Sequence, residues 1–120
     1  MKQLKNFTIE EFESPDLKGS GELMDKNFLF MLDKARDLAN TSFVITSGYR
    51  TEDHNSNVGG VSNSSHCKGL ACDIACKDSR KRSNIITALL AVGFTRVGVA
   101  SSFIHVDNDL DKSQDLIWTY

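Results

Sequence analysis

The sequence predicts an α+β domain in which helices pack on a small, mainly antiparallel sheet. Residues 23–40 and 78–93 carry apolar residues at helical spacing, and short segments rich in β-branched and aromatic residues lie between and after them. The order of elements is helix, strand, loop, strand, helix and then strands, which is typical of an α+β arrangement. The chain has 120 residues, a length that fits one domain, so we expect residues 1–120 to form a single unit.

The first elements are a short helix, a polar loop and a long amphipathic helix. In the stretch TIEEF, Thr8 is placed to cap one helical turn and Glu11 to reach back to the cap. The polar loop ESPDLKGSGE follows and holds the only proline. Residues 23–40 then predict the amphipathic helix. Its expected buried stripe consists of Phe28, Met31, Leu32, Ala35 and Leu38.

The remaining elements alternate strands with one more helix. SFVITSGYR predicts a strand that ends in a turn at Gly48, and residues 51–65 predict a long irregular loop. LACDIAC predicts a short strand, and residues 78–93 a helix that Asp78 or Ser79 caps and Gly93 ends. TRVGVA, SFIHVDND and DLIWTY predict the last short strands. The expected buried face of the second helix consists of Ile85, Ile86, Leu89 and Leu90.

Composition and charge exclude several classes of function. The formal net charge is -2 and no long block of like charge occurs, so we expect no nucleic-acid partner. No segment has the apolar length of a signal peptide or a membrane span, so we expect no membrane association and a cytoplasmic protein, unless something releases it from the cell. Cys67, Cys72 and Cys76 are odd in number and lack Cys-x-x-Cys spacing, so we expect them to act as small hydrophobes.

Two histidines and an aspartate are candidate metal ligands. Asp73 lies in an apolar strand, where a carboxylate is costly unless it is paired, hydrogen-bonded or bound to a cation. Strand alternation in FIHVD places Phe103, His105 and Asp107 on one face. His66, Asp73 and His105 can therefore share one sheet surface, and two imidazoles with one carboxylate are a common ligand set for catalytic zinc. Spacing alone leaves open a hydrogen-bonded core histidine and a capping aspartate.

These residues belong to a longer pattern. SGYR is followed by HN and GG, then by SSHCKGLACDI and later by FIHVD. In combination, and over residues 7–118, these motifs resemble the zinc D-Ala-D-Ala carboxypeptidase family. That family includes peptidoglycan-cleaving phage endolysins and shares its fold with the signalling domain of hedgehog proteins. The residues that match its S-x-H-x-x-G-x-A-x-D pattern are Ser64, His66, Gly69, Ala71 and Asp73.

The resemblance implies a role for each residue that matches. His66, Asp73 and His105 would bind Zn²⁺. Arg50, in SGYR, would face the substrate and hydrogen-bond a developing oxyanion or a substrate carboxylate. The implied function is zinc-dependent hydrolysis of D-alanine-containing peptidoglycan peptides, either as a carboxypeptidase or as an endolysin-type endopeptidase. We expect the enzyme to be a monomer.

The chain departs from this family at the general base. Many relatives carry an acid or a histidine two or three residues before the last zinc ligand, where this chain has Ser102 and Phe103. Asp107 is the remaining candidate, and it would act either as the base or as a partner that holds the imidazole of His105. The second role leaves an alternative function open, namely a weak or inactive zinc-containing module that binds cell wall or a protein partner. A zinc-stabilised structural piece of a phage particle is a third interpretation.

Overall fold

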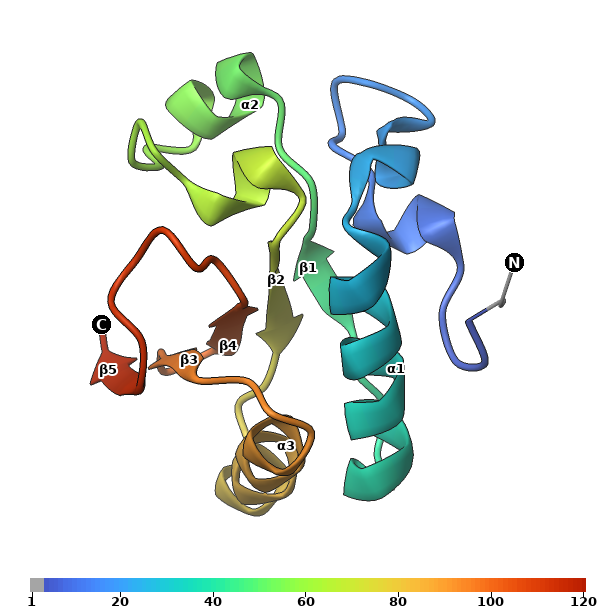
Figure 1. Cartoon of the computed structure of the whole chain (residues 1–120), viewed down its shortest axis with the longest axis vertical. Helices are drawn as coiled ribbons and strands as arrows, with labels where there is room; N and C mark the ends of the chain where they lie inside the picture. Colours follow the sequence, from blue (N-terminus) through green and yellow to red (C-terminus); the bar gives the residue numbers. More distant parts are fainter. Residues whose placement is uncertain (1–3) are drawn as a thin grey trace.

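A computed structural model describes residues 4–120 and shows helices packed against a five-stranded mixed sheet (Figure 1). The α+β fold class is therefore confirmed. The α-helices are α1 (Lys26–Ala39), α2 (Glu52–Asn57) and α3 (Ser79–Ala91). Three 3₁₀ turns are η1 (Ile9–Phe12), η2 (Ser20–Leu23) and η3 (Ser65–Lys68). The strands are β1 (Ile45–Ser47), β2 (Ala71–Ala75), β3 (Arg96–Val99), β4 (Phe103–Asp107) and β5 (Leu116–Thr119).

The sheet has the strand order β1-β2-β4-β3-β5, so β2 and β4 lie near its centre although α3 and β3 separate them in sequence. Three of the four strand pairs are antiparallel, and only β3 and β5 run parallel. The expectation of a mainly antiparallel sheet is thus confirmed. The central pairing matters most for function, because it brings residues 71–75 opposite residues 103–107.

The two faces of the sheet differ in chemistry. On one face, alternate residues of β2, β3 and β4 enter the hydrophobic core, which α1 and α3 also line. The core residues from these strands are Cys72, Ile74, Val97, Ile104 and Val106. The intervening residues, including Asp73 and His105, project from the opposite face. The apolar alternation therefore places the polar candidates on the side away from the packed helices.

Local sequence signals account for the element ends. The Glu11 carboxylate accepts a hydrogen bond of 2.7 Å from the backbone N–H of Thr8, as predicted for η1. Asp78, rather than Ser79, caps α3 by accepting 2.8 Å from the backbone N–H of Lys81. Gly93 follows the end of α3 with φ +108°, a conformation that favours glycine.

Three details of the sequence prediction are wrong. Leu38 is 57% exposed and Leu90 42% exposed, so neither belongs to the core. The buried stripe of α1 instead runs through Ala35 to Ala39, which turns Leu38 toward solvent. Residues 51–65 are not irregular throughout, because α2 forms there with Thr51 as a cap that accepts 3.1 Å from the backbone N–H of His54.

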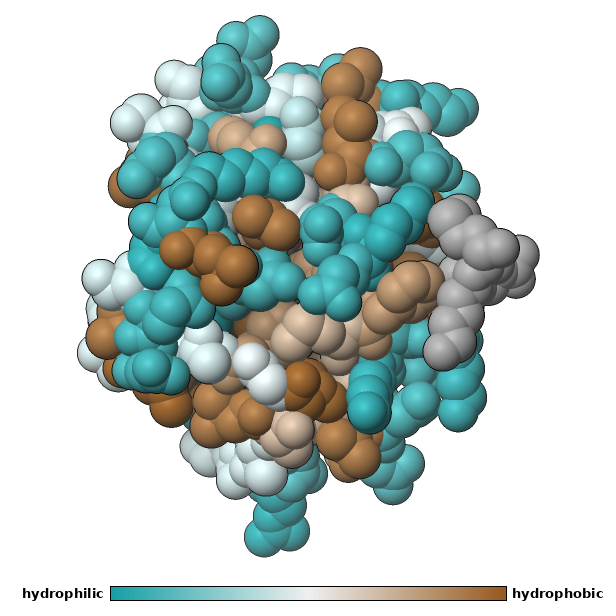
Figure 2. Space-filling view, viewed as in Figure 1, coloured by the Kyte–Doolittle hydropathy of each residue, from teal (hydrophilic) through white to brown (hydrophobic). Residues whose placement is uncertain are grey.

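Among residues 4–120, none of the helices combines the length and the apolar character that crossing a bilayer needs. The face drawn in Figure 2 intersperses apolar and hydrophilic residues. The expectation that the N-terminus lacks a signal segment also concerns residues 1–3, which lie outside the described part of the chain.

Candidate metal centre

The centre of the sheet brings Asp73 and His105 together. They are direct register partners on β2 and β4. The adjacent residues Ile74 and Ile104 enter the core, so the two polar side chains project from the other face. Oδ1 of Asp73 lies 3.0 Å from Nδ1 of His105. Antiparallel pairing therefore assembles this pair from positions that are 32 residues apart.

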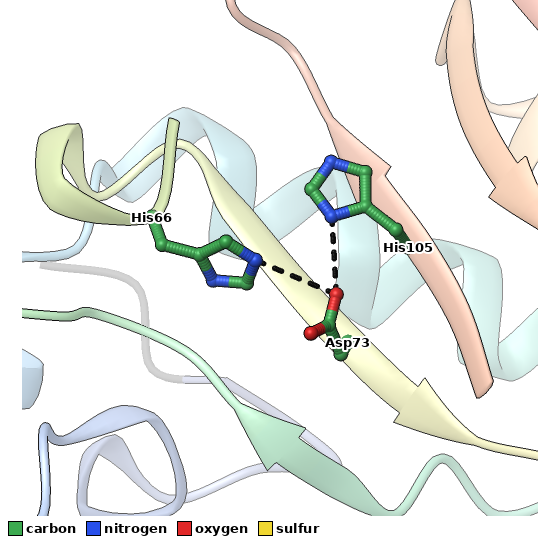
Figure 3. A group of neighbouring side chains, drawn as sticks. All are labelled: His66, Asp73 and His105. Carbon is green, nitrogen blue, oxygen red and sulfur yellow. Dashed lines mark hydrogen bonds and ion pairs between the residues drawn. The ribbon is translucent and has the colours of Figure 1, made fainter. Parts of the chain in front are cut away.

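His66 reaches the same place from the turn that precedes β2. Ser64 caps η3 by accepting 3.2 Å from the backbone N–H of His66. Gly69 ends the turn with φ +71°, and a Cβ there would collide with the carbonyl oxygen of Leu23. The turn places Nε2 of His66 3.4 Å from Oδ1 of Asp73 (Figure 3). Gly69 therefore permits a close approach between this turn and the backbone of Leu23.

His66, Asp73 and His105 each direct one ligand-type atom toward a common point. These three atoms all lie within 4.8 Å of one another. The other nitrogen of each imidazole is engaged elsewhere: Nδ1 of His66 donates 2.8 Å to the carbonyl of Gly48, and Nε2 of His105 lies 2.7 Å from Oδ2 of Asp107. Nε2 of His66 and Nδ1 of His105 are thus left to face Asp73. Orienting contacts of this kind on the second ring nitrogen are usual for metal-bound histidines.

The two carboxylates, Asp73 and Asp107, supply negative charge that suits a cation. Burial would raise the pKa of Asp73, but hydrogen bonds from His105 and His66 hold that pKa well below its usual range. Burial likewise opposes charge on His105, yet its hydrogen bonds to Asp107 and Asp73 raise the pKa of His105. Burial would also raise the pKa of Asp107, whereas its hydrogen bonds with His105 and Arg96 lower it. Both carboxylates are therefore ionised at neutral pH.

Arg50, which the family resemblance implies faces the substrate, lies beside the cluster. Its Nη2 is 3.5 Å from Oδ2 of Asp73, the carboxylate oxygen that does not face the imidazoles. Its Nε donates 3.0 Å to Oγ of Ser47 and its Nη1 donates 3.2 Å to Oδ1 of Asn55. Asn55 in turn donates 2.8 Å to the carbonyl of Val61. These contacts hold the guanidinium at the site and join it to the loop that follows α2.

Asp107 has no free carboxylate oxygen. Oδ2 contacts Nε2 of His105, and Oδ1 accepts 2.7 Å from Nε of Arg96 and 3.1 Å from the backbone N–H of Asp109. Its side chain is 1% exposed. Of the two roles predicted for Asp107, this geometry favours holding the imidazole of His105 over acting as a base.

Arg96 and Trp118 are site residues that the sequence reasoning missed. The cluster opens into a hollow of about 350 Å³ that both residues line together with Phe103 and Tyr120. Trp118 lies opposite Gly98, where a Cβ would come within 2.7 Å of the indole. The bare glycine therefore lets the indole lie over the sheet, with its centroid 5.6 Å from that of His105. An isolated glycine inside a strand signals such close approach.

A second hollow of about 420 Å³ adjoins the first. The two share Arg50, Val58 and Asp73, so Asp73 lies where they meet, whereas His66 and His105 line the first hollow. Gly59 and Gly60, in the loop that follows α2, line the first hollow. Gly59 has φ +76°, a conformation that glycine adopts without strain.

Comparison with known proteins identifies the family of this chain. The model of the family described as Peptidase M15 matches residues 5–107, which include Arg50, all three members of the cluster, and Asp107. The match ends before β5, whereas the resemblance seen in the sequence extends to residue 118. No curated protein matches the chain significantly. Because the match covers most of the sequence, this chain belongs to the peptidase M15 family, the zinc D-Ala-D-Ala carboxypeptidase-like family, and this membership supports a peptidase role.

Proposed function

We propose that the protein is a zinc-dependent metallopeptidase that hydrolyses D-alanine-containing peptides of peptidoglycan. The observation that carries this proposal is the convergence of His66, Asp73 and His105, whose ligand-type atoms lie within 4.8 Å of one another at the edge of a hollow. Family membership supplies the peptidase role. The substrate class comes from the sequence resemblance.

The residues present fit a zinc ion. Two imidazole nitrogens and one carboxylate oxygen are the donor set of many catalytic zinc sites, and Gly48 and Asp107 already orient the rings that would supply the nitrogens. We propose Nε2 of His66, Oδ1 of Asp73 and Nδ1 of His105 as the ligands. When bound, zinc supplies a Lewis acid that polarises a peptide carbonyl and acidifies water.

Arg50 and Asp107 are the proposed polar groups around these ligands. Arg50 keeps N–H groups beyond those used by Ser47, Asn55 and Asp73, and these can donate to the oxygen of a substrate carbonyl as negative charge develops on it. Asp107 holds His105 so that Nδ1 faces the other ligands. We propose this positioning role as its main contribution to catalysis.

Zinc stoichiometry tests the ligand assignment. His66→Ala and His105→Ala should each abolish stoichiometric zinc binding, measured by inductively coupled plasma mass spectrometry after dialysis. His54→Ala is the matched control, because His54 lies in α2 outside the cluster and its loss should leave one zinc ion per chain. Retention of one tightly bound zinc ion in either His66→Ala or His105→Ala would disprove the assignment.

Product analysis tests the reaction. Zinc-loaded protein is incubated with purified peptidoglycan fragments, and the products are identified by mass spectrometry with His66→Ala alongside. Loss of a terminal D-alanine would establish a carboxypeptidase, and a cut within a crosslink an endopeptidase. No cleavage by protein that holds its zinc would refute the proposed activity.

A specific observation favours the alternative, a zinc-containing binding module. Both carboxylate oxygens of Asp107 are occupied, by His105 and by Arg96 with Asp109, and the two positions that carry a base in many relatives are Ser102 and Phe103. A catalytically weak domain would still bind its ligand in the same hollows. Saturable binding of uncleaved peptidoglycan fragments, lost in His66→Ala, would identify this module.

The proposed organisation is a monomer in which residues 1–120 form one peptidase domain that reaches the cell wall on phage lysis. Sedimentation equilibrium tests the monomer, and limited proteolysis tests the single domain, since a second domain would yield a separate stable fragment. Cell fractionation before and after lysis tests the location.

A further inference from the structure

Asp109 is a buried carboxylate that the proposed reaction does not use. Its side chain is 1% exposed, although it lies in the polar segment that follows β4. Oδ2 accepts 2.7 Å from the hydroxyl of Ser65, and Nζ of Lys68 lies 3.0 Å from the same oxygen. Oδ1 accepts 3.1 Å from the backbone N–H of Asp111. Buried charges are costly unless they are paired and hydrogen-bonded, so these contacts are what stabilise the buried carboxylate of Asp109.

The partners of Asp109 bracket a proposed zinc ligand. Ser65 and Lys68 are the first and last residues of η3, and His66 lies between them. η3 is a single 3₁₀ turn of four residues, too short to hold a fixed position by its own hydrogen bonds. Asp109 joins both ends of η3 to the segment that directly follows β4. The carboxylate thereby fixes the segment that aims Nε2 of His66 at Asp73.

The segment His105–Asp109 also fastens the other imidazole. Asp107 accepts from the backbone N–H of Asp109 at 3.1 Å and contacts His105 at 2.7 Å. Residues 105, 107 and 109 therefore have successive tasks: one is a proposed ligand, the next orients that ligand, and the third holds the turn that carries His66. One short segment sets the relative position of both imidazoles.

We propose that Asp109 is a positioning residue of the metal centre, acting on His66 through Ser65 and Lys68. This inference rests on the proposed zinc site. Beyond that site, the proposal is that Asp109 sets the affinity for zinc although it contacts none of the ligands, because Asp109 fixes the ligand geometry before the ion binds.

The experiment compares Asp109→Asn with Asp111→Asn. Asp111 is the matched control, because it also lies 3.3 Å from Nζ of Lys68 but its side chain is 84% exposed and does not contact Ser65. Zinc dissociation constants are measured by competition with a chromophoric chelator. Asp109→Asn should weaken zinc binding about 10–100-fold, the range found when partners of metal ligands are removed. Asp111→Asn should stay within about twofold of wild type, because its contact with Lys68 is solvent-screened.

Ser65→Ala keeps the test decisive if Asp109→Asn does not fold. It removes one hydroxyl from the Asp109 contact and should weaken zinc binding while the metal-free protein keeps its circular dichroism spectrum. Wild-type zinc affinity in a folded Asp109→Asn variant would overturn the inference. If Asp109→Asn does not fold, wild-type zinc affinity in Ser65→Ala would overturn it. Equal weakening in Asp109→Asn and Asp111→Asn would overturn it as well, since a general charge effect would then explain both.

A readout without zinc separates this inference from the proposed function. In metal-free protein, the Nδ1 proton of His66 donates to Gly48 and should give a slowly exchanging imidazole NMR signal. That proton should exchange faster in Asp109→Asn than in Asp111→Asn. Failure of wild-type protein to bind zinc would refute the proposed metal site, whereas an unchanged exchange rate in Asp109→Asn would refute the role of Asp109.

Discussion

Arg96→Met is the perturbation whose energetic cost follows most directly from the structure. The Arg96 side chain is 10% exposed and that of Asp107 is 1% exposed, and Nε lies 2.7 Å from Oδ1. The guanidinium also donates to the carbonyl of Ser113 at 2.6 Å and lies 4.9 Å from the ring centroid of Trp118. Methionine keeps much of the apolar stem but removes the positive charge and both hydrogen bonds. Asp107 would then be buried with only His105 and one backbone N–H as partners.

The expected loss is about 3–5 kcal/mol of unfolding free energy, because removing the guanidinium leaves the buried Asp107 carboxylate with only part of its compensation. This is a large share of the roughly 5–15 kcal/mol that stabilises a typical domain. Asp107→Asn should recover part of the loss when it is combined with Arg96→Met, because the double variant buries neither charge. We expect a coupling of about 1–3 kcal/mol between the two substitutions, within the range for residues in contact.

The assay is urea unfolding followed by circular dichroism in the presence of a chelator, so that metal binding does not contribute. Wild type, both single variants and the double variant form the cycle. Arg80→Met is the control, because Arg80 is an exposed arginine at the start of α3 and its substitution should change stability by less than about 0.5 kcal/mol. A loss below about 1 kcal/mol in Arg96→Met, or strictly additive effects in the cycle, would contradict the description of this pair as a buried, mutually dependent contact.

Three further predictions test other parts of the molecule. Zinc titration should change the fluorescence emission of Trp118, the only tryptophan, because its ring centroid lies 5.6 Å from that of His105. An unchanged emission spectrum on stoichiometric zinc binding would refute this proximity. The stability advantage of wild type over Asp109→Asn should be constant near neutral pH and shrink below about pH 4, because the pKa of Asp109 is lowered: burial raises it, but hydrogen bonds from Ser65 and Lys68 outweigh burial. Urea unfolding across pH 2–7 measures this difference in unfolding free energy. A difference that grows on acidification would contradict the prediction. Replacing all of Cys67, Cys72 and Cys76 by alanine should leave one zinc ion per chain, because no cysteine belongs to the cluster. Loss of the metal in this variant would identify a thiolate ligand.

Local sequence patterns predict most of the helices and strands, and together with the wider motif they indicate all three proposed ligands. Helical periodicity, the Thr8 and Asp78 caps and the strand alternation are local signals, and they predict local structure because each depends on residues a few positions apart. Asp73 stood out for a similar reason, since a carboxylate in an apolar strand needs a partner. The histidines required the wider motif, because spacing alone did not exclude a structural role.

The tertiary structure alone decided how these residues are held. The register of β2 against β4 makes Asp73 and His105 neighbours, and it depends on the packing of segments far apart in the chain. The burial of Arg96 against Asp107, and of Asp109 against η3, likewise joins residues that no local pattern relates. The exposure of Leu38 and Leu90 also depends on tertiary packing. Both residues fit the helical periodicity, but the neighbouring elements decide which edge of each apolar stripe is covered. Sequence patterns identify the candidate metal ligands, and only non-local packing fixes the direction in which each ligand side chain points.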